Sequence, residues 1–523
     1  MALVSDASGG DHLKVRSGSG RRLALSGVSA TALVGRVAIF LGLALVALGV
    51  LGVSSAADLP LAGNLDRSFG NGGVVTHTLG GTAVPTSEGI AVQPDGKIVV
   101  VTSGSVVRYL LDGSLDPSFG AGGYVATAFD AAAVALQPDG KIVVAGAMSD
   151  GSELDGSEFA VARYNPDGSP DPSFGTDGTT TTIFPSGGYA VPADASANTL
   201  AILHDGDIVA AGSVTWFTSD VVEPSNFALV GYKPDGSLDP TFGDDGIVET
   251  EFVGQDTLSG IVVEPDDKIV ATGTGSYNGH GEYVDGMALA RYDPGGSLDF
   301  STTTPDLSAK PKRFYLGGPP VLQHGRILVA GARLPNNACC YPSGRLLVAR
   351  YDSDFSLDPT FGKHGLAEIS GATGPASAVA AQQDGKILVA AKGSILRLLP
   401  NGRLDPSFGR GGIVSLRNRT STALALQAGQ KILVGEARGH AWTLARLLGG
   451  NNCVVPKLRG KALSKARKTL KASYCRTGRI SWLFSSRVAR GHVISTATPL
   501  GDRFPDGTKV DLAVSRGKRT QRP

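Results

Sequence analysis

The histidines and acidic residues of this sequence are the first candidates for catalysis or metal binding. The eight histidines are scattered along the 523 residues, and no metal-spaced cluster, nucleophile elbow or phosphate-binding loop is present. The run NPDGSPD at 165–171 has spacing close to that of a calcium loop, but it lacks the third early ligand and the chelating glutamate. We therefore expect no catalytic residues, no metal and no cofactor. Cys339 and Cys340 are adjacent, so a disulfide between them would be strained, and their state stays open.

Aromatic side chains in long variable segments are the candidates for ligand binding. The segments 148–158, 213–226, 274–286 and 332–344 connect strand-like runs in four consecutive units of a repeat. Exposed loop aromatics stack on sugars or peptides, which favours a carbohydrate or peptide ligand, and ordinary packing within the loops is the alternative. The candidate ligand-binding residues are Trp216, Phe217, Tyr277, His280, Tyr283 and Tyr341.

The repeat that contains these segments organises most of the chain. The stretch YKPDGSLDPTFG at 232–243 recurs with few changes at 109–120, 164–175, 351–362 and 398–409. A trimmed copy begins at Asn64, and a decayed one follows Tyr292. A second signature, DGKIVV and its variants, occurs at intervals of 44 to 66 residues, beginning at Asp95, Asp139, Asp205, Asp266, His324, Asp384 and Gly429. A sequence repeat of this length indicates the overall architecture, whereas a local motif does not.

The residue types of the repeated motif have separate physical roles. In LDPSFG the Asp can cap a turn, the Pro supplies the φ of its first position, and the Gly closes it with positive φ. The Phe is the one large apolar residue, so we expect it to pack between neighbouring units. Asp-Gly between apolar runs predicts tight hairpins. An arginine precedes the first motif residue, Tyr or Leu, in six units, and we expect it to pair with the motif Asp, such as Asp171 or Asp358.

Each unit offers four strand candidates, which in the first unit are 74–78, 89–93, 97–101 and 106–110. Four strands in each of seven units predict a mainly β chain with a seven-bladed β-propeller of four-stranded antiparallel blades, and a β-solenoid is the alternative. Either the first strand completes the last blade or each blade lies within one unit. Because successive strands are antiparallel, we expect the long variable segments to gather on one face, where a binding surface would lie.

The LDPSFG turn and the QPDGKIVVAG hairpin resemble those of the delta-60 repeat family. The resemblance covers residues 64–448, about three quarters of the chain. It implies a repeat architecture in an exported bacterial protein and brings no established reaction. The third unit departs from the pattern with Gly231 before Tyr232, and the fifth opens with the decayed LDFST.

Residues 1–57 have the pattern of an export segment. Residues 1–36 are polar and basic, and 37–53 form an unbroken apolar run of 17 residues. A helix of that length would span about 25 Å, less than the roughly 30 Å of a bilayer core. Small residues at 54–57 fit a signal-peptidase site, so the segment is either a cleaved signal peptide or an N-terminal membrane anchor. In both cases we expect the rest to be exported, secreted or associated with the cell envelope, with a membrane contact only if the segment is uncleaved.

The C-terminal part is basic and has no repeat. Residues 450–523 carry 17 Lys and Arg against 3 Asp and Glu, although the whole chain has a net charge of +1. After a linker at 449–452, the segments VPKLRGKALSKARKTL and GHVISTATPLGDRFPDGTKVDLAVSRG resemble a PASTA domain, a small α+β fold, over 453–517, and 518–523 form a basic tail. In an exported domain of this size we expect Cys453 and Cys475 to form a disulfide. The resemblance implies peptidoglycan binding, and the charge favours an anionic wall glycopolymer.

Together these expectations describe an exported, non-enzymatic envelope protein. The propeller would act as a binding or display scaffold, and the PASTA domain would bind peptidoglycan or another wall polymer. One alternative is a propeller enzyme, such as a hydrolase, a lyase or a quinoprotein, that acts on an extracellular carbohydrate or peptide. Another is a purely structural spacer. Nucleic-acid binding is not expected of an exported protein.

Overall fold

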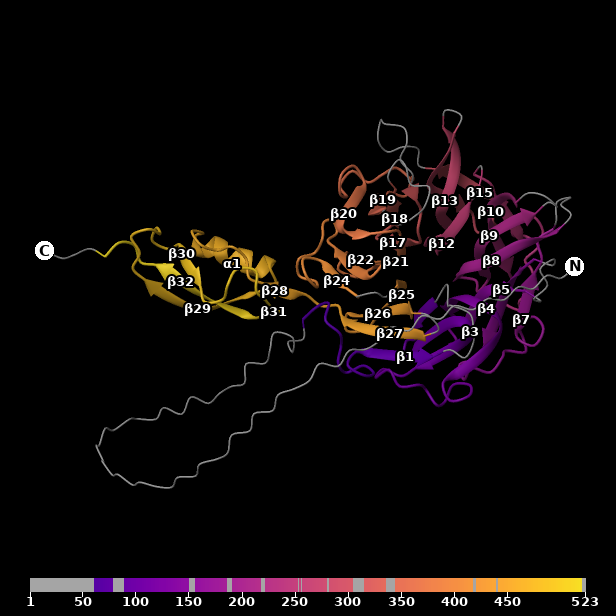
Figure 1. The fold of residues 1–523 in the computed structure, drawn as a ribbon, viewed down its shortest axis with the longest axis horizontal. Helices are drawn as coiled ribbons and strands as arrows, with labels where there is room; N and C mark the ends of the chain where they lie inside the picture. The colour runs from indigo at the N-terminus through magenta and orange to yellow at the C-terminus, as the bar shows by residue number, and fades with distance from the viewer. Residues whose placement is uncertain are drawn as a thin grey trace, which may run out of the picture. The chain divides into compact units, whose positions relative to one another are not determined.

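The fold is built almost entirely from strands (Figure 1). The computed structural model describes residues 61–78, 89–149, 156–185, 191–217, 222–252, 254, 256–279, 282–303, 315–334, 344–416, 420–438 and 441–519. The predicted export segment at 1–57 and the residues His280, Cys339, Cys340 and Tyr341 lie outside this part of the chain. Among the described residues, no helix is both long and apolar enough to cross a membrane.

The first two blades are joined through one long strand. Their strands are β2 (Gly89–Val92), β3 (Ile98–Tyr109), β4 (Tyr124–Leu136), β5 (Ile142–Met148), β6 (Glu158–Tyr164) and β7 (Thr179–Thr182). β3 covers the two strands predicted at 97–101 and 106–110 except for the first residue of one and the last residue of the other. The first part of β4 pairs with β3, and its second part, from Ala131 to Leu136, pairs with β5. β4 therefore belongs to both blades.

Each of the next four blades has a sheet of its own, with consecutive strands antiparallel. The third and fourth blades contain β8 (Val191–Ile202), β9 (Ile208–Phe217), β10 (Val222–Tyr232), β11 (Ile247–Thr250), β12 (Thr257–Val263), β13 (Ile269–Gly279), β14 (Glu282–Tyr292) and β15 (Leu298–Thr303). The fifth and sixth contain β16 (Tyr315–Leu316), β17 (Pro320–Gln323), β18 (Arg326–Arg333), β19 (Arg345–Tyr351), β20 (Leu366–Thr373), β21 (Ala376–Ala381), β22 (Ile387–Ala391), β23 (Ser394–Leu398) and β24 (Ile413–Ser415).

The seventh blade combines strands from both ends of the repeat region. It contains β25 (Thr420–Gln427), β26 (Lys431–Arg438), β27 (Ala441–Leu448) and β1 (Val74–Thr78), which lies beside β27 in Figure 1. The register of this pair runs from Val74 opposite Ala445 to Thr78 opposite Ala441. The first strands of successive blades contact one another, and β25 contacts β2, so the series closes. The described residues thus form a seven-bladed propeller in which the first strand completes the last blade.

The phenylalanine of the repeated motif fills the space between blades, as the sequence predicts. Phe119 lies between β3 and β4 of the first blade and packs with Ile142, Val144 and Ala160 of the second. An added Cβ at Gly168, also in the second blade, would lie 2.9 Å from the Phe119 ring. The equivalent buried rings are Phe69, Phe174, Phe242, Phe361 and Phe408. An added Cβ would also lie within 3.1 Å of the ring at the equivalent glycines, which are Gly113, Gly236, Gly296 and Gly402. These rings therefore leave no room for a side chain in the following unit.

An arginine clamp accompanies this ring at six of the blade junctions. In the second blade, Nε of Arg163 lies 2.6 Å and Nζ of Lys141 2.9 Å from Oδ2 of Asp171. Nη1 of Arg163 donates to the carbonyl of Pro234 in the third blade, and its Cζ lies 4.7 Å from the centre of the Phe174 ring. The other clamps pair Arg108 with Asp116, Arg291 with Asp299, Arg350 with Asp358, Arg397 with Asp405 and Arg446 with Asp66. The predicted Arg–Asp pairing is confirmed, and the same side chain also bonds the next blade.

An aromatic ring also fills the space between the fourth and fifth blades, but a different residue supplies it. The fourth blade lacks the motif phenylalanine, and the fifth has Phe355 where most other units have the turn glycine. The Phe355 backbone has φ +63, and its ring stacks on Phe300 with 4.9 Å between centroids. Cζ of Arg291 lies 5.0 Å from the centre of the Phe355 ring. An aromatic ring from the following blade thus replaces the missing one.

The PASTA-like region contains two small sheets and one helix. Its elements are β28 (Asn452–Val454), α1 (Leu463–Ala472), β29 (Arg476–Leu483), β30 (Val493–Thr496), β31 (Arg503–Pro505) and β32 (Lys509–Ser515). β32 lies between β29, to which it is parallel, and β30, while β28 pairs with β31. α1 buries Ala466 and Leu470 on one face, and the predicted disulfide between Cys453 and Cys475 is present in the same core.

Replacing Gly168 with Ala should destabilise the propeller more than its positive φ alone explains. A side chain at φ +88 costs about 1 kcal/mol, and contact with the Phe119 ring should add about 2 kcal/mol. Gly104→Ala is the matched control, because Gly104 has φ +80 and no atom within 4 Å of the added Cβ. Chemical denaturation measures both variants. Equal losses would contradict the packing role of the glycine.

The clamp at the closing blade predicts a response to acid. Burial raises the pKa of Asp66, but hydrogen bonds from Lys431 and Ser68 and the charge of Arg446 outweigh it and lower that pKa from 3.8 to about 2. The stabilisation from the ionised carboxylate is therefore complete above about pH 4 and is lost as the pH falls towards 2. Asp66→Asn should lower stability at pH 7 by about 3 kcal/mol, because it leaves Arg446 without its partner charge.

Thermal unfolding measured between pH 7 and pH 2 tests this prediction. The Asp66→Asn variant should have a lower Tm at pH 7 and a smaller further loss between pH 4 and pH 2 than the unchanged protein. Asp244→Asn is the control, because the Asp244 side chain is exposed. An Asp66→Asn variant with the acid profile of the unchanged protein would refute a stabilising role for the ionised carboxylate.

Candidate functional site

Trp216, one of the six predicted ligand-binding residues, is buried. It is 6% exposed and belongs to a core cluster with Phe159 and Phe184, between the second and third blades. The prediction that Trp216 is an exposed loop residue is wrong. β9 pairs with β8 and β10 as far as Phe217, so the sheet continues through the segment that the sequence assigns to a loop.

Three other candidates also lie in paired strands. The predicted loop at 274–286 is a hairpin in which β13 and β14 pair as far as Gly279 and Glu282. Tyr277 lies opposite Val284 and Tyr283 opposite Asn278, so the structure brings these two tyrosines into one hairpin. Phe217 belongs to another, where it lies opposite Val222. His280 and Tyr341 lie outside the described residues, and ligand binding on this face stays a prediction.

The inside of the propeller ring is lined by the first strands of the blades. These strands carry mostly small and aliphatic residues, with the sequences GIAV, AAAVAL, ANTLAI, LSGIVV, PVLQ, AVAA and ALALQ at 89–92, 131–136, 197–202, 258–263, 320–323, 378–381 and 423–427. None of these seven segments contains a titratable side chain. Among the described residues, no three His, Cys, Asp or Glu side chains are grouped so that they could hold a metal ion. These segments therefore supply no acid–base pair.

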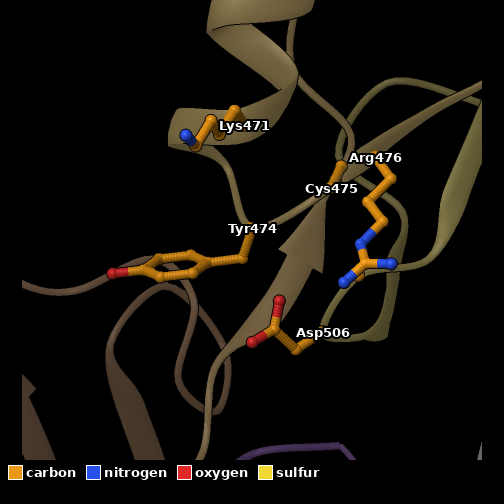
Figure 2. Close-up of a pocket in the computed structure, with 6 residues that line it drawn as sticks. Lys471, Tyr474, Cys475, Arg476 and Asp506 are labelled. Carbon is orange, nitrogen blue, oxygen red and sulfur yellow. The ribbon is translucent and has the colours of Figure 1, made fainter.

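A hollow in the PASTA-like region gathers charged side chains beside the disulfide (Figure 2). Its volume is about 300 Å³, and its lining is Lys471, Tyr474, Cys475, Arg476, Asp506 and Gly507. Lys471 lies in the last turn of α1, Arg476 begins β29, and Asp506 lies in the turn between β31 and β32. Figure 2 shows the side chains of Arg476 and Asp506 extending into the same space. The hollow therefore offers both hydrogen-bond donors and an acceptor to a ligand.

Tyr474 has an unusual backbone conformation at the edge of this hollow. Its φ of +55 is in the left-handed region, which the residue after a helix usually reaches as glycine. The Cys475 amide donates to the Leu470 carbonyl at 2.9 Å, and the Gly507 amide donates to the Tyr474 carbonyl at 2.9 Å. Nζ of Lys386, in the sixth blade, lies 4.7 Å from the centre of the Tyr474 ring. The tyrosine is thus fixed by its backbone and contacts a propeller lysine.

Exposed basic side chains lie on the helix and the strand that contribute Lys471 and Arg476 to the hollow. They are Lys465, Arg467, Lys468 and Lys471 on α1 and Arg476 and Arg479 on β29. A cationic surface with an aromatic ring suits a polyanion that contains sugars. The sequence identifies the basic segment as a whole but does not single out Tyr474, Arg476 or Asp506. The available signal is the PDG turn at 505–507, which has the same signature as the propeller hairpins.

Comparison with known proteins supports both parts of this architecture. The family described as "Domain of unknown function (DUF5122) beta-propeller" matches residues 93–119, 137–174, 204–242, 264–301, 325–361 and 382–408. The PASTA domain family matches residues 454–516. No curated protein matches the sequence.

Several solved structures are similar over most of the chain but have low identity. A polysaccharide lyase, Uly1, is 12% identical with a TM-score of 0.40, and the match covers 75% of this chain and 97% of that one. The Pan2 WD40 domain of Neurospora crassa is 12% identical with a TM-score of 0.38, covering 70% and 90%. A gluconolactonase of Xanthomonas campestris is 13% identical with a TM-score of 0.35, covering 74% and 95%. We draw no conclusion about activity from these likenesses.

The family matches agree with the turn motif, the hairpin signature and the closed ring of blades. The chain therefore carries DUF5122 β-propeller repeats, of the delta-60 type, and a PASTA domain at its C-terminal end.

Proposed function

We propose that this protein is exported and held at the cell envelope by its PASTA domain, with the propeller as a non-enzymatic scaffold for binding or display. In this proposal the PASTA domain contacts peptidoglycan or an anionic wall glycopolymer through the hollow at Lys471, Tyr474 and Arg476. The observation that carries the proposal is a PASTA domain whose exposed helix face and adjoining strand are basic. The apolar run at 37–53 and the disulfide are consistent with export.

The hollow has the chemistry that a wall polymer would require. Lys471 and Arg476 can donate charge-assisted hydrogen bonds to phosphate or carboxylate groups, and Arg476 can do so with two nitrogens at once. Asp506 can accept from a sugar hydroxyl or an amide, and the Tyr474 ring offers an apolar face to a sugar. The backbone at these residues is held by a helix end and two turns of a disulfide-linked core, so it needs little ordering when a ligand binds.

A rigid ring is well suited to display. The arginine clamps and buried phenylalanines tie each blade to the next, whereas the hairpins at the opposite ends of the strands differ in length between units. Length variation on a fixed frame is the usual arrangement of binding surfaces in repeat proteins. We propose that a carbohydrate or peptide binds this face, at hairpins such as the one that contains Tyr277 and Tyr283.

Sedimentation with purified peptidoglycan sacculi that retain their anionic glycopolymers tests the wall-binding site. The protein should pellet with the sacculi, and the double variant Lys471→Gln/Arg476→Gln should bind about tenfold or more weakly, because two charge-assisted hydrogen bonds are lost. Sacculi stripped of the glycopolymers show which of the two polymers binds.

The matched control removes the same number of charges from the propeller. Lys363→Gln/Lys392→Gln changes two exposed lysines and should leave the bound fraction within about twofold of the unchanged protein. An equal loss in both double variants would mean that only net charge matters. No sedimentation of the unchanged protein with either kind of sacculus would refute wall binding.

A further inference from the structure

Three consecutive large apolar side chains are exposed at the end of β29. Trp482, Leu483 and Phe484 are 44%, 51% and 54% exposed, respectively. Soluble proteins rarely expose several such side chains together, and patches of this kind mark interaction surfaces. None of the three lines the hollow at Lys471 and Arg476, so this apolar tip is separate from the proposed wall-binding site.

The backbone of the apolar tip is held in place. β29 is an edge strand, paired only with β32 among the described residues (Figure 1). The Arg516 amide donates to the Leu483 carbonyl at 2.7 Å, and the Ser485 amide donates to the Gly517 carbonyl at 3.0 Å. Both hydrogen bonds lie beside the exposed side chains. The tip is therefore a fixed projection from the sheet, and its exposure is a property of the fold.

Two arginines lie close to the apolar tip, and other exposed basic residues belong to the same segments. The guanidinium carbons of Arg516 and Arg519 lie 5.8 and 5.9 Å from the centre of the Phe484 ring. Arg487, Arg490 and Lys518 are also exposed. Residues 480–490 and 512–519 contain five Lys and Arg and no Asp or Glu. The surface therefore combines an apolar centre with a cationic rim.

We propose that this surface docks on the anionic face of a phospholipid bilayer. Trp482, Leu483 and Phe484 enter the boundary between headgroups and acyl chains, and the arginines and Lys518 lie over anionic headgroups. Tryptophan and phenylalanine favour that boundary, and a basic rim adds electrostatic attraction to anionic lipids. A wall polymer would use the basic rim and an aromatic face but would leave Leu483 without an apolar partner, so the bilayer is the better fit.

The three tryptophans of the chain give a direct test. Trp216 and Trp442 are 6% and 0% exposed, so Trp482 is the one tryptophan that a bilayer can reach, and residues 1–57 contain none. The full chain is mixed with phosphatidylglycerol vesicles whose acyl chains carry bromine, a contact quencher. We expect a blue shift and quenching of Trp482 emission that weaken at high salt and are absent with phosphatidylcholine vesicles. Trp482→Phe should abolish both signals.

Matched variants separate insertion from attraction by charge alone. Leu483→Ser/Phe484→Ser keeps the Trp482 reporter and should weaken partitioning about tenfold or more, because apolar area no longer leaves water. Leu500→Ser changes a side chain that is 64% exposed outside the tip and should have no effect. Arg516→Gln/Arg519→Gln should reduce binding to phosphatidylglycerol and its dependence on salt.

Three other outcomes would overturn the proposal. Loss of binding with Leu500→Ser equal to that with the tip variant would mean that the tip is not specific. A blue shift with soluble polyphosphate, without quenching by brominated chains, would assign the surface to a polyanion. A blue shift that depends on protein concentration without vesicles, together with a dimer mass in sedimentation, would show that a second copy covers the tip. Each result is independent of sedimentation with sacculi, so this proposal and the wall-binding proposal can fail separately.

Discussion

The structure of the propeller depends on an arginine that belongs to two blades at once. Arg163 is 5% exposed, and its guanidinium pairs with Asp171 of its own turn, donates to a carbonyl of the next blade and covers the Phe174 ring. A buried guanidinium is costly unless its donors are satisfied. Removal of the next blade would expose the apolar ring and leave one donor without its acceptor. The blades are therefore stable as members of a ring, and each clamp makes the folding of one blade depend on its neighbour.

The departures from the repeat show which feature this constraint preserves. In the third blade Gly231 replaces the arginine, and the Phe242 ring lies 2.5 Å from the position that a Cβ would take there. Lys233 supplies the positive charge instead, 2.9 Å from both Asp207 and Asp239. At the fourth junction Phe355 supplies the ring that the motif lacks. An aromatic ring between the blades and a positive charge beside the buried carboxylate are therefore kept, although different residues provide them.

The sequence predicts the fold in detail because the same local chemistry is repeated. Seven copies of one hairpin signature predict the number of blades, and the recurring Arg and Asp predict their own pairing. The variable hairpins have no second copy, and strand pairing there extends beyond the turn signals, which is why Trp216 is predicted in a loop but lies in the core. The hollow brings together Lys471, Arg476 and Asp506 from three elements. Such a site depends on tertiary contacts, so composition predicts its charge but not its members.

Ring closure also explains where the PASTA domain begins. The seventh copy of the motif is divided between the two ends of the repeat region. Arg446 comes from β27, and its partner Asp66 comes from the segment before β1. Arg397 donates to the carbonyls of Gly449 and Gly450. In the preceding clamp, the equivalent acceptor is the carbonyl of Pro400. The side chain of Asn452 then bonds both backbone groups of Ala62. The residues predicted as a linker therefore complete the last turn of the ring. Because β28 starts at Asn452, the first strand of the PASTA domain begins at a residue that closes the propeller. Loss of the seventh blade would therefore also remove the hydrogen bonds that fix the start of that strand.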